Sequence, residues 1–125
     1  MTQTQIYFDD SFKDHVSSLD YPERTDRVKN IIDLINNEEF KNITIIKPNN
    51  VDYSHIYEAH DKSFVDETLD RFPKDEQIVF LDQETPVSRG SFEATLKAAG
   101  AGIDAADNVI NKKCMNAFCI VRPPG

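Results

Sequence analysis

The stretch Asn116-Ala117-Phe118-Cys119-Ile120-Val121-Arg122-Pro123-Pro124-Gly125 joins an apolar run to a rigid turn. The run predicts a β-strand over residues 116–121, and its continuous apolar pattern is typical of a strand covered on both faces. The two prolines cannot continue a central strand, because each lacks an N–H donor. In open parallel sheets, ligands bind beyond the carboxyl ends of the strands. We therefore expect residues 122–125 to lie at the functional edge of a sheet.

Two shorter runs upstream predict the other strands. Ile6-Tyr7-Phe8 forms the first, and Ile43-Thr44-Ile45-Ile46 forms the second, which is β-branched throughout. We expect the second strand to be largely buried and residues 9–20 to form a loop.

Helical spacing separates these strands. A first helix is expected to begin at Asp20-Tyr21-Pro22-Glu23, with Asp20 as its cap and Glu23 returning a hydrogen bond, and to end at Asn36. Two short helices should follow, the second beginning near Asp61 and ending before Pro73, and then a short extended segment over residues 78–81. The apolar residues expected on the packing face of the first helix are Val28, Ile31, Ile32 and Ile35.

A long helix is expected from about residue 88 or 91 onward. Gly100 and Gly102 weaken it, so we favour tight packing of this helix on the sheet over a phosphate-binding role. Its expected packing face comprises Phe92, Leu96, Ala99, Ile103, Ala106 and Ile110. The order strand, helix, strand, helices, strand predicts one α/β domain over residues 1–125 with a covered, mostly parallel sheet.

Composition excludes several classes of protein. The chain has 125 residues with 14 Lys and Arg against 22 Asp and Glu, a formal net charge of −8, which argues against direct nucleic-acid binding. Its apolar runs are too short to cross a membrane, and no secretory signal is recognisable, so we expect a cytoplasmic protein. Cys114 and Cys119 are expected to be reduced thiols without a functional role.

Four segments together resemble the histone deacetylase family, which includes histone deacetylase-like amidohydrolases, acetylpolyamine amidohydrolases and acetoin-utilisation proteins. The most specific is the strand ending in Arg122-Pro123-Pro124-Gly125. The others are Tyr21-Pro22-Glu23-Arg24-Thr25-Asp26-Arg27, where Tyr21 replaces a His and Thr25 a Pro; His60 with Phe64-Val65; and Leu81-Asp82-Gln83-Glu84-Thr85 with Ser88, Gly90, Ser91, Ala94 and Ala98-Ala99-Gly100.

The resemblance implies a three-layer α/β/α fold of the arginase and deacetylase type, of which this chain would be the N-terminal part. A complete member of the family binds zinc through two Asp and one His and hydrolyses an acetamide of acetyl-lysine or an acetylpolyamine. Two adjacent His that follow the Pro-Pro-Gly turn act as base and acid, and a later Tyr polarises the carbonyl. The sequence contains no His-His pair and no Asp-x-His. We therefore expect no metal or cofactor site in this chain, and no activity from it alone, with zinc bound by the longer parent.

The same resemblance implies site residues. Tyr21 and Pro22 match the rim of the acyl-lysine tunnel, and residues 122–125 form the active-site turn. Asp75 and Glu76 match an acidic rim loop that holds substrate, although solvated surface side chains are the favoured reading of this pair. Arg27 matches an arginine that lines an acetate channel, which would point its side chain into the fold. An i, i+4 ion pair between Arg27 and Glu23 is an equally good reading.

The three histidines do not form a ligand set. His55 and His60 are five residues apart, which does not place both on one helical face, so both are interpreted as structural. For His15 a solvated loop side chain is favoured over a functional one.

Three functions compete at this point. The first is an N-terminal part of a zinc-dependent deacetylase-like hydrolase, inactive by itself. The second is a stand-alone binding or regulatory module on the same fold. An arginase-like enzyme with paired metals is a third, and the Arg-Pro-Pro-Gly turn argues against it. An incomplete sheet would expose apolar surface, so we also expect self-association through the last strand.

Overall fold

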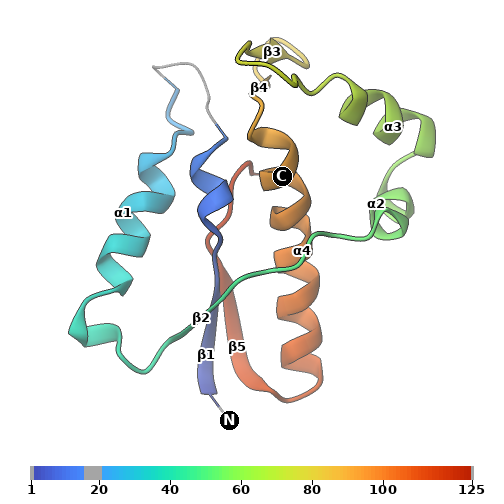
Figure 1. Ribbon diagram of the computed structural model, residues 1–125. Coiled ribbons are helices and arrows are strands. Elements are labelled where there is room, and N and C mark those ends of the chain that lie inside the picture. The colour runs from blue at the N-terminus through green and yellow to red at the C-terminus, as the bar shows by residue number, and fades with distance from the viewer. Residues whose placement is uncertain (1, 16–20, 125) are drawn as a thin grey trace.

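The computed structural model describes residues 2–15 and 21–124, which form a small α/β unit (Figure 1). Asp20, the expected helix cap, and Gly125 of the turn lie outside the described residues. The described elements, with η for 3-10 helices, are β1 (Thr2–Tyr7), η1 (Asp10–Lys13), α1 (Asp26–Ile35), η2 (Glu38–Phe40), β2 (Thr44–Ile46), α2 (Tyr53–Ala59), α3 (Lys62–Asp70), β3 (Val79–Phe80), β4 (Pro86–Val87), α4 (Ser91–Ile110) and β5 (Cys114–Cys119).

The sheet is parallel, as predicted. β1 lies between β2 and β5 and pairs with both in parallel, so that Ile6 is opposite Ile45 on one side and Phe118 on the other. The expected strands are confirmed with shifted bounds, since β1 begins four residues earlier and β5 ends two residues earlier than the apolar runs indicate. All three strands end at the same edge, which also carries the Arg122 turn.

Helices lie on both faces of this sheet. On one face, Ala101 and Ala105 of α4 pack against Tyr7. On the other, Ile6 joins a core with Val28 and Ile32 of α1. The architecture is therefore a partial three-layer α/β/α fold with a parallel sheet, as expected.

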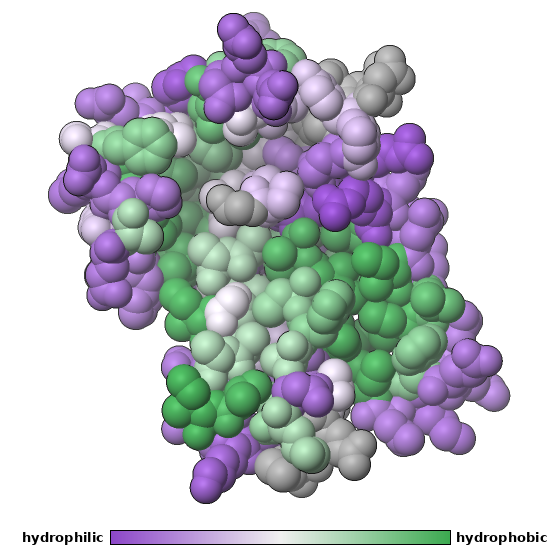
Figure 2. Space-filling model, turned by 180° about the vertical axis from the view of Figure 1, so that it is seen from behind, coloured by the Kyte–Doolittle hydropathy of each residue, from purple (hydrophilic) through white to green (hydrophobic). Residues whose placement is uncertain are grey.

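The face carrying Ile6 is covered only in part. Ile45 and Phe118, the register partners of Ile6, are 41% and 57% exposed. Figure 2 shows apolar residues gathered over the middle of the molecule on its rear side. The prediction that β2 is largely buried is wrong, because β2 is an edge strand and α1 does not extend over its outer residues.

The first helix begins later than its sequence indicates. α1 starts at Asp26, and Thr25 occupies the cap position without a side-chain capping bond. The carboxylate of Glu23 binds Arg122, and the expected bond back to the N–H of Asp20 lies outside the described residues. A long-range ion pair that the sequence did not predict therefore engages Glu23. Val28 and Ile32 are buried as expected, whereas Ile31 is exposed.

The packing face of α4 differs from the expected one. Its buried residues are mainly small, and the side chains of Ala99, Ala106 and Ile110, which were expected to pack, are exposed. Small residues allow the helix backbone to approach the sheet closely. The helix therefore packs through its small residues, although the expected face carries larger apolar side chains. The buried residues of α4 are Ser91, Ala94, Leu96, Gly100, Ala101 and Ala105.

Of the two glycines, only Gly100 lies at a close contact, and the contact is with the loop after β2 rather than with the sheet. A Cβ atom on Gly100 would overlap the carbonyl of Asn49, whereas a Cβ atom on Gly102 would meet open space. A close approach therefore exists at Gly100, but to a loop rather than to the sheet that was expected, and none exists at Gly102.

The connections contain structure that periodicity does not reveal. Phe12, within the expected loop, is fully buried on η1 and makes an edge-on ring contact with Phe8. The two short helices α2 and α3 are confirmed, with Asp61 at the start of α3. β3 and β4 pair as an antiparallel hairpin. No helix within the described ranges is long and apolar enough to span a membrane.

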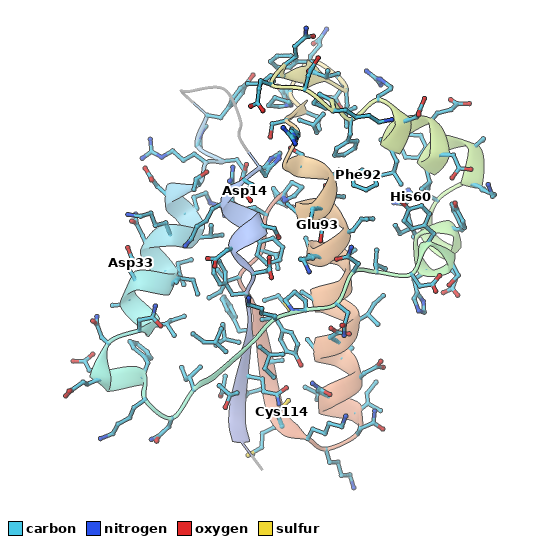
Figure 3. The ribbon with its side chains drawn as sticks, viewed as in Figure 1. Asp14, Asp33, His60, Phe92, Glu93 and Cys114 are labelled. Atoms are coloured by element: carbon cyan, nitrogen blue, oxygen red, sulfur yellow. The ribbon has the colours of Figure 1, made fainter. Side chains whose placement is uncertain are left out.

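Both cysteines are free thiols, in agreement with the sequence. Cys114 lies at the amino end of β5, far from the turn, as Figure 3 shows. Burial raises the pKa of the Cys119 thiol, which is directed at the carbonyl of Ala101. This disfavours a reactive thiolate.

Candidate functional site

A cluster of buried polar residues lies at the carboxyl edge of the sheet. Its centre is Arg122, three residues beyond β5, whose side chain has no solvent exposure at all. Burial of a guanidinium requires an acidic partner and saturated donors, because an unpaired charge in the interior is very costly.

Arg122 meets this requirement through four groups. Its Nε donates to Oε1 of Glu23 at 2.7 Å and its Nη2 donates to Oε2 at 3.0 Å, which is a two-point contact between planar groups. Its Nη1 donates to the carbonyls of Phe12 and His15 and to Oγ1 of Thr25. Two separate segments, residues 12–15 and 23–25, therefore surround one side chain.

Glu23 faces three cationic or titratable groups. Besides Arg122, Nη1 of Arg27 lies 3.5 Å from its Oε1, and Nε2 of His15 lies 3.6 Å from its Oε2. Burial alone would raise the pKa of the Glu23 carboxyl, but the hydrogen bonds and charge of Arg122 outweigh it and lower the pKa below its ordinary value. Glu23 is therefore held as a carboxylate.

His15 is buried against this carboxylate. Its Nδ1 lies 2.6 Å from Oγ of Ser91, the first residue of α4. Burial, together with the charge of Arg122, lowers the pKa of His15, so the imidazole is neutral near pH 7. The tautomer with a proton on Nε2 satisfies both neighbours, because Nε2–H then faces Glu23 and Nδ1 accepts from Ser91.

The start of α4 completes the cluster. The backbone N–H of Ser88 donates to Oγ of Ser91 at 2.7 Å, and the Ser88 hydroxyl donates to the carbonyl of Asp14 at 3.1 Å. A Cβ atom on Gly90 would overlap Asp14. Figure 3 shows Asp14 beside the N-terminal end of α4. The end of η1 and the start of α4 are thus held in direct contact.

The predicted rim residues lie near this cluster in sequence but are not part of its interior. Tyr21 is half-buried and Pro22 is exposed, directly before Glu23. The side chain of Arg27 is 55% exposed and lies beside Glu23. The two residues thus form the ion pair that was the alternative to the channel role. That channel role stays a prediction, as does the rim role of Tyr21 and Pro22.

The acidic loop residues are exposed. The Asp75 carboxylate accepts from the backbone N–H of Gln77, and Glu76 pairs with Arg89 at 3.2 Å. Figure 1 shows the loops around β3 and β4 at the same end of the molecule as the ends of β1 and β5. Their role in substrate binding stays a prediction.

In the turn itself, Arg122 is buried, Pro123 is half-buried and Pro124 is exposed. The turn therefore emerges from the interior to the surface within three residues. Among the described residues, no three His, Cys, Asp or Glu side chains come close enough to hold a metal ion. The described residues accordingly do not by themselves fit a zinc site.

Sequence reasoning missed the partnership of Glu23 with Arg122 and the burial of His15. The expectation of a solvated His15 is wrong, since the residue is 4% exposed. Glu23 and Arg122 are 99 positions apart, so no local spacing joins them. The one available signal was an arginine directly after an apolar strand, because such a side chain must find an acid if the strand is buried. His55 and His60 are exposed, and their interpretation as structural residues stays a prediction.

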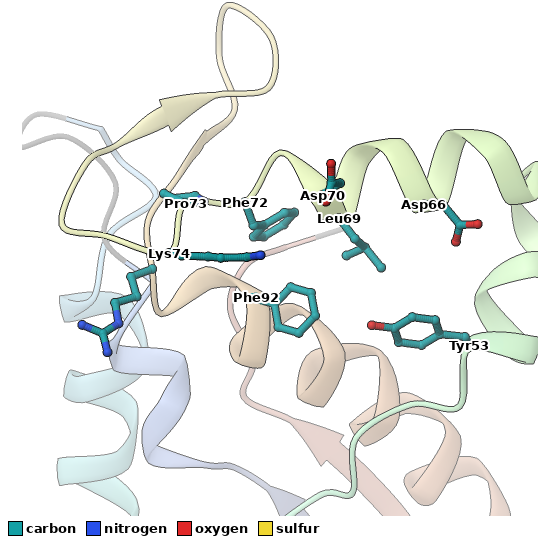
Figure 4. A pocket seen from close by; sticks show the side chains of 9 residues that line it. Tyr53, Asp66, Leu69, Asp70, Phe72, Pro73, Lys74 and Phe92 are labelled. Carbon is teal, nitrogen blue, oxygen red and sulfur yellow. The ribbon is translucent and has the colours of Figure 1, made fainter.

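A separate pocket of about 520 Å³ opens between α3 and the start of α4 (Figure 4). Tyr53, Phe72 and Phe92 contribute aromatic side chains, with Phe72 and Phe92 in an edge-on contact at 6.0 Å between ring centroids. Asp66, Asp70, Lys74 and Arg89 give its lining charges of both signs. The lining charge therefore does not select a ligand.

Comparisons with known proteins agree on one family. Residues 21–125 match the family model described as the histone deacetylase domain. A protein of Archaeoglobus fulgidus named "Probable deacetylase" is 34% identical over 125 residues, covering 98% of this chain and 34% of that protein. The crystal structure of the HDA15 HD domain superposes with a TM-score of 0.87 at 23% identity, covering 99% of this chain and 36% of that one.

The chain spans about one third of the length of both relatives. The matched region includes Glu23, Ser91 and Arg122 of the polar cluster, whereas the segment from Phe12 to His15 precedes it. The structural likeness extends over the whole chain and supports the same fold. The chain belongs to the histone deacetylase family.

Proposed function

We propose that this chain is the N-terminal part of a deacetylase-like hydrolase that cleaves the acetamide of acetyl-lysine or of acetylated polyamines. The observation that carries the proposal is the Arg122 turn, held at the carboxyl edge of a parallel sheet in a chain that matches the histone deacetylase domain. That edge is where ligands bind in open parallel sheets.

The described residues support a positioning role better than a reacting one. Arg122 and Glu23 are engaged with each other, and His15 is neutral and enclosed. None of these groups is placed to attack a carbonyl. The chemistry of the proposed hydrolase therefore has to come from other residues of the longer protein, with this chain shaping the edge of the site.

Zinc is part of this proposal only for the longer protein. Such an ion would lower the pKa of a bound water and stabilise an oxyanion. Since the described residues do not fit a metal site, the ligands have to lie outside them. Removal of metal is therefore expected to leave the fold of the 125-residue chain unchanged.

The exposed acids suit a cationic substrate. Asp75 and Glu76 lie on the loop predicted to form the rim, and the net charge of −8 attracts cations over long range. An acetylated polyamine carries such charge, as does a lysine-rich peptide. This supports a substrate of positive net charge.

Acetate release from an acetyl-lysine peptide and from an acetylated polyamine tests the proposal. The longer protein is expected to release acetate from one of them, and the 125-residue chain from neither. Stoichiometric zinc binding together with acetate release by the 125-residue chain would refute the assignment of this chain as an inactive part.

A second candidate is a stand-alone binding or regulatory module. It is favoured by the polar cluster around Arg122, whose donors are partnered within the described residues. The reading frame beyond the codon for Gly125 separates the two. A frame that continues into a His-His pair supports the hydrolase, and a stop codon supports the module.

We also propose that the 125-residue chain self-associates through β5. Phe118 and Met115 on this edge strand are 57% and 62% exposed, and exposed apolar edges are common sites of association. The occupant would be a second copy, paired strand to strand.

A further inference from the structure

The turn of Pro123 and Pro124 cannot hold itself by main-chain hydrogen bonds. Proline has no N–H donor, so these two residues can offer only acceptors. The backbone N–H of Ile120 donates to the carbonyl of Tyr7 at 2.9 Å, and no main-chain bond to the sheet follows it in the described chain. The position of the turn therefore depends on side chains.

The side chain of Arg122 is placed to hold the turn in position. It precedes Pro123 directly, it is fully buried, and it binds Glu23 at two points. Its contacts with the carbonyls of Phe12 and His15 anchor it to the segment that follows β1. One residue thus ties the turn to two segments more than 90 positions away in sequence.

The energetics favour a geometric role for this pair. Desolvation of a buried ion pair offsets most of its Coulomb attraction, and apolar side chains of the same volume often stabilise a fold as well or better. A two-point contact between planar groups, in contrast, fixes both distance and orientation. Apolar residues could therefore match the stability that the pair provides, but they could not fix the orientation of Arg122 relative to Glu23.

We propose that Glu23 and Arg122 are positioning residues, which set the direction in which the backbone enters the Pro123-Pro124 turn at the edge of the site. The inference rests on the proposed function for its catalytic consequence, because misplacement of a reacting group by about 1 Å can reduce a rate about 100-fold. The pair acts through the turn and touches no substrate.

The first experiment uses the 125-residue chain and the variant Glu23→Gln, with Asp33→Asn as the control. Asp33 lies on α1 in an exposed pair with Lys29, so the control removes an equivalent charge without touching the turn. Hydrogen exchange of the Arg122 Nε–H by NMR is expected to accelerate at least tenfold in Glu23→Gln only, while the amides of Tyr7 and Ile120 keep their protection. Unchanged exchange at Arg122, or equal loss of protection across the sheet, would overturn the proposal.

The second experiment uses the longer hydrolase. Glu23→Gln is expected to lower kcat at least tenfold with a much smaller change in KM, because the pair acts through the turn and touches no substrate. If that variant does not fold, the double variant Glu23→Leu with Arg122→Met replaces the pair by apolar residues. A folded double variant with reduced kcat supports the proposal, and one with unchanged kcat overturns it.

Each of the two proposals can be refuted without refuting the other. A wild-type hydrolase that releases no acetate refutes the proposed function. The exchange rate of the Arg122 Nε–H in the 125-residue chain still decides whether the pair positions the turn.

Discussion

Gly100 on α4 lies so close to Asn49 that a Cβ atom at position 100 would overlap the Asn49 carbonyl oxygen. The loop cannot retreat easily, because the N–H of Asn49 donates to Asp104 at 2.8 Å and the N–H of Val51 donates to the carbonyl of Leu96 at 3.0 Å. The loop after β2 is therefore held against the helix at this glycine.

Gly100→Ala is expected to destabilise the fold by about 3 kcal/mol, the upper end for overpacking at a site that cannot relax. Gly102→Ala is the matched control, since a Cβ atom there meets nothing within 4 Å. It should gain about 1 kcal/mol from helix propensity. Urea denaturation of both variants measures the difference, and equal effects at the two positions would contradict the close contact.

The stability of the chain should fall as the pH drops below 6.5. The pKa of His15 in the folded state lies below its ordinary value of 6.5, so the unfolded chain takes up the proton first. Its contribution is therefore full above pH 6.5 and is lost between that pH and the folded pKa. His15→Asn should flatten this part of the profile, with the exposed His55→Asn as control. Identical pH slopes in wild type and His15→Asn would contradict the prediction.

A second loss of stability is expected at lower pH from Glu23. Its folded pKa lies below its ordinary value of 4.5, so its stabilising contribution is present above pH 4.5 and is lost as the pH falls through the folded pKa. Glu23→Ala should cost about 3 kcal/mol at pH 7, since it leaves the buried Arg122 unpaired. Chemical denaturation between pH 3 and 7 measures both effects. A Glu23→Ala variant as stable as Asp33→Ala would show that the pair adds nothing.

Association of the 125-residue chain should depend on β5. Phe118→Lys places a charge on the exposed strand and is expected to shift sedimentation toward monomer. Ile110→Lys is the control, because Ile110 is 74% exposed but lies at the end of α4. A wild-type chain that stays monomeric at high concentration would refute self-association, and an equal response to both variants would refute the assignment to β5.

The sequence alone determined the type and order of the main elements. Unbroken β-branched and apolar runs predicted the three strands, and the helices expected between them predicted a mostly parallel sheet. The strand ending in Arg122-Pro123-Pro124-Gly125 was specific enough to indicate the family. The types of the elements could be predicted because the conformation of a strand or helix depends largely on side chains that are close together in the sequence.

The tertiary structure alone decided which groups meet. The carboxylate of Glu23 binds Arg122, 99 positions away, because a buried guanidinium needs an acidic partner and no local spacing supplies one. The packing face of α4 follows its small residues, since close approach to the sheet depends on the shape of the partner surface. His15 is enclosed for the same reason: its neighbours Glu23 and Ser91 come from segments that only the folded chain brings together.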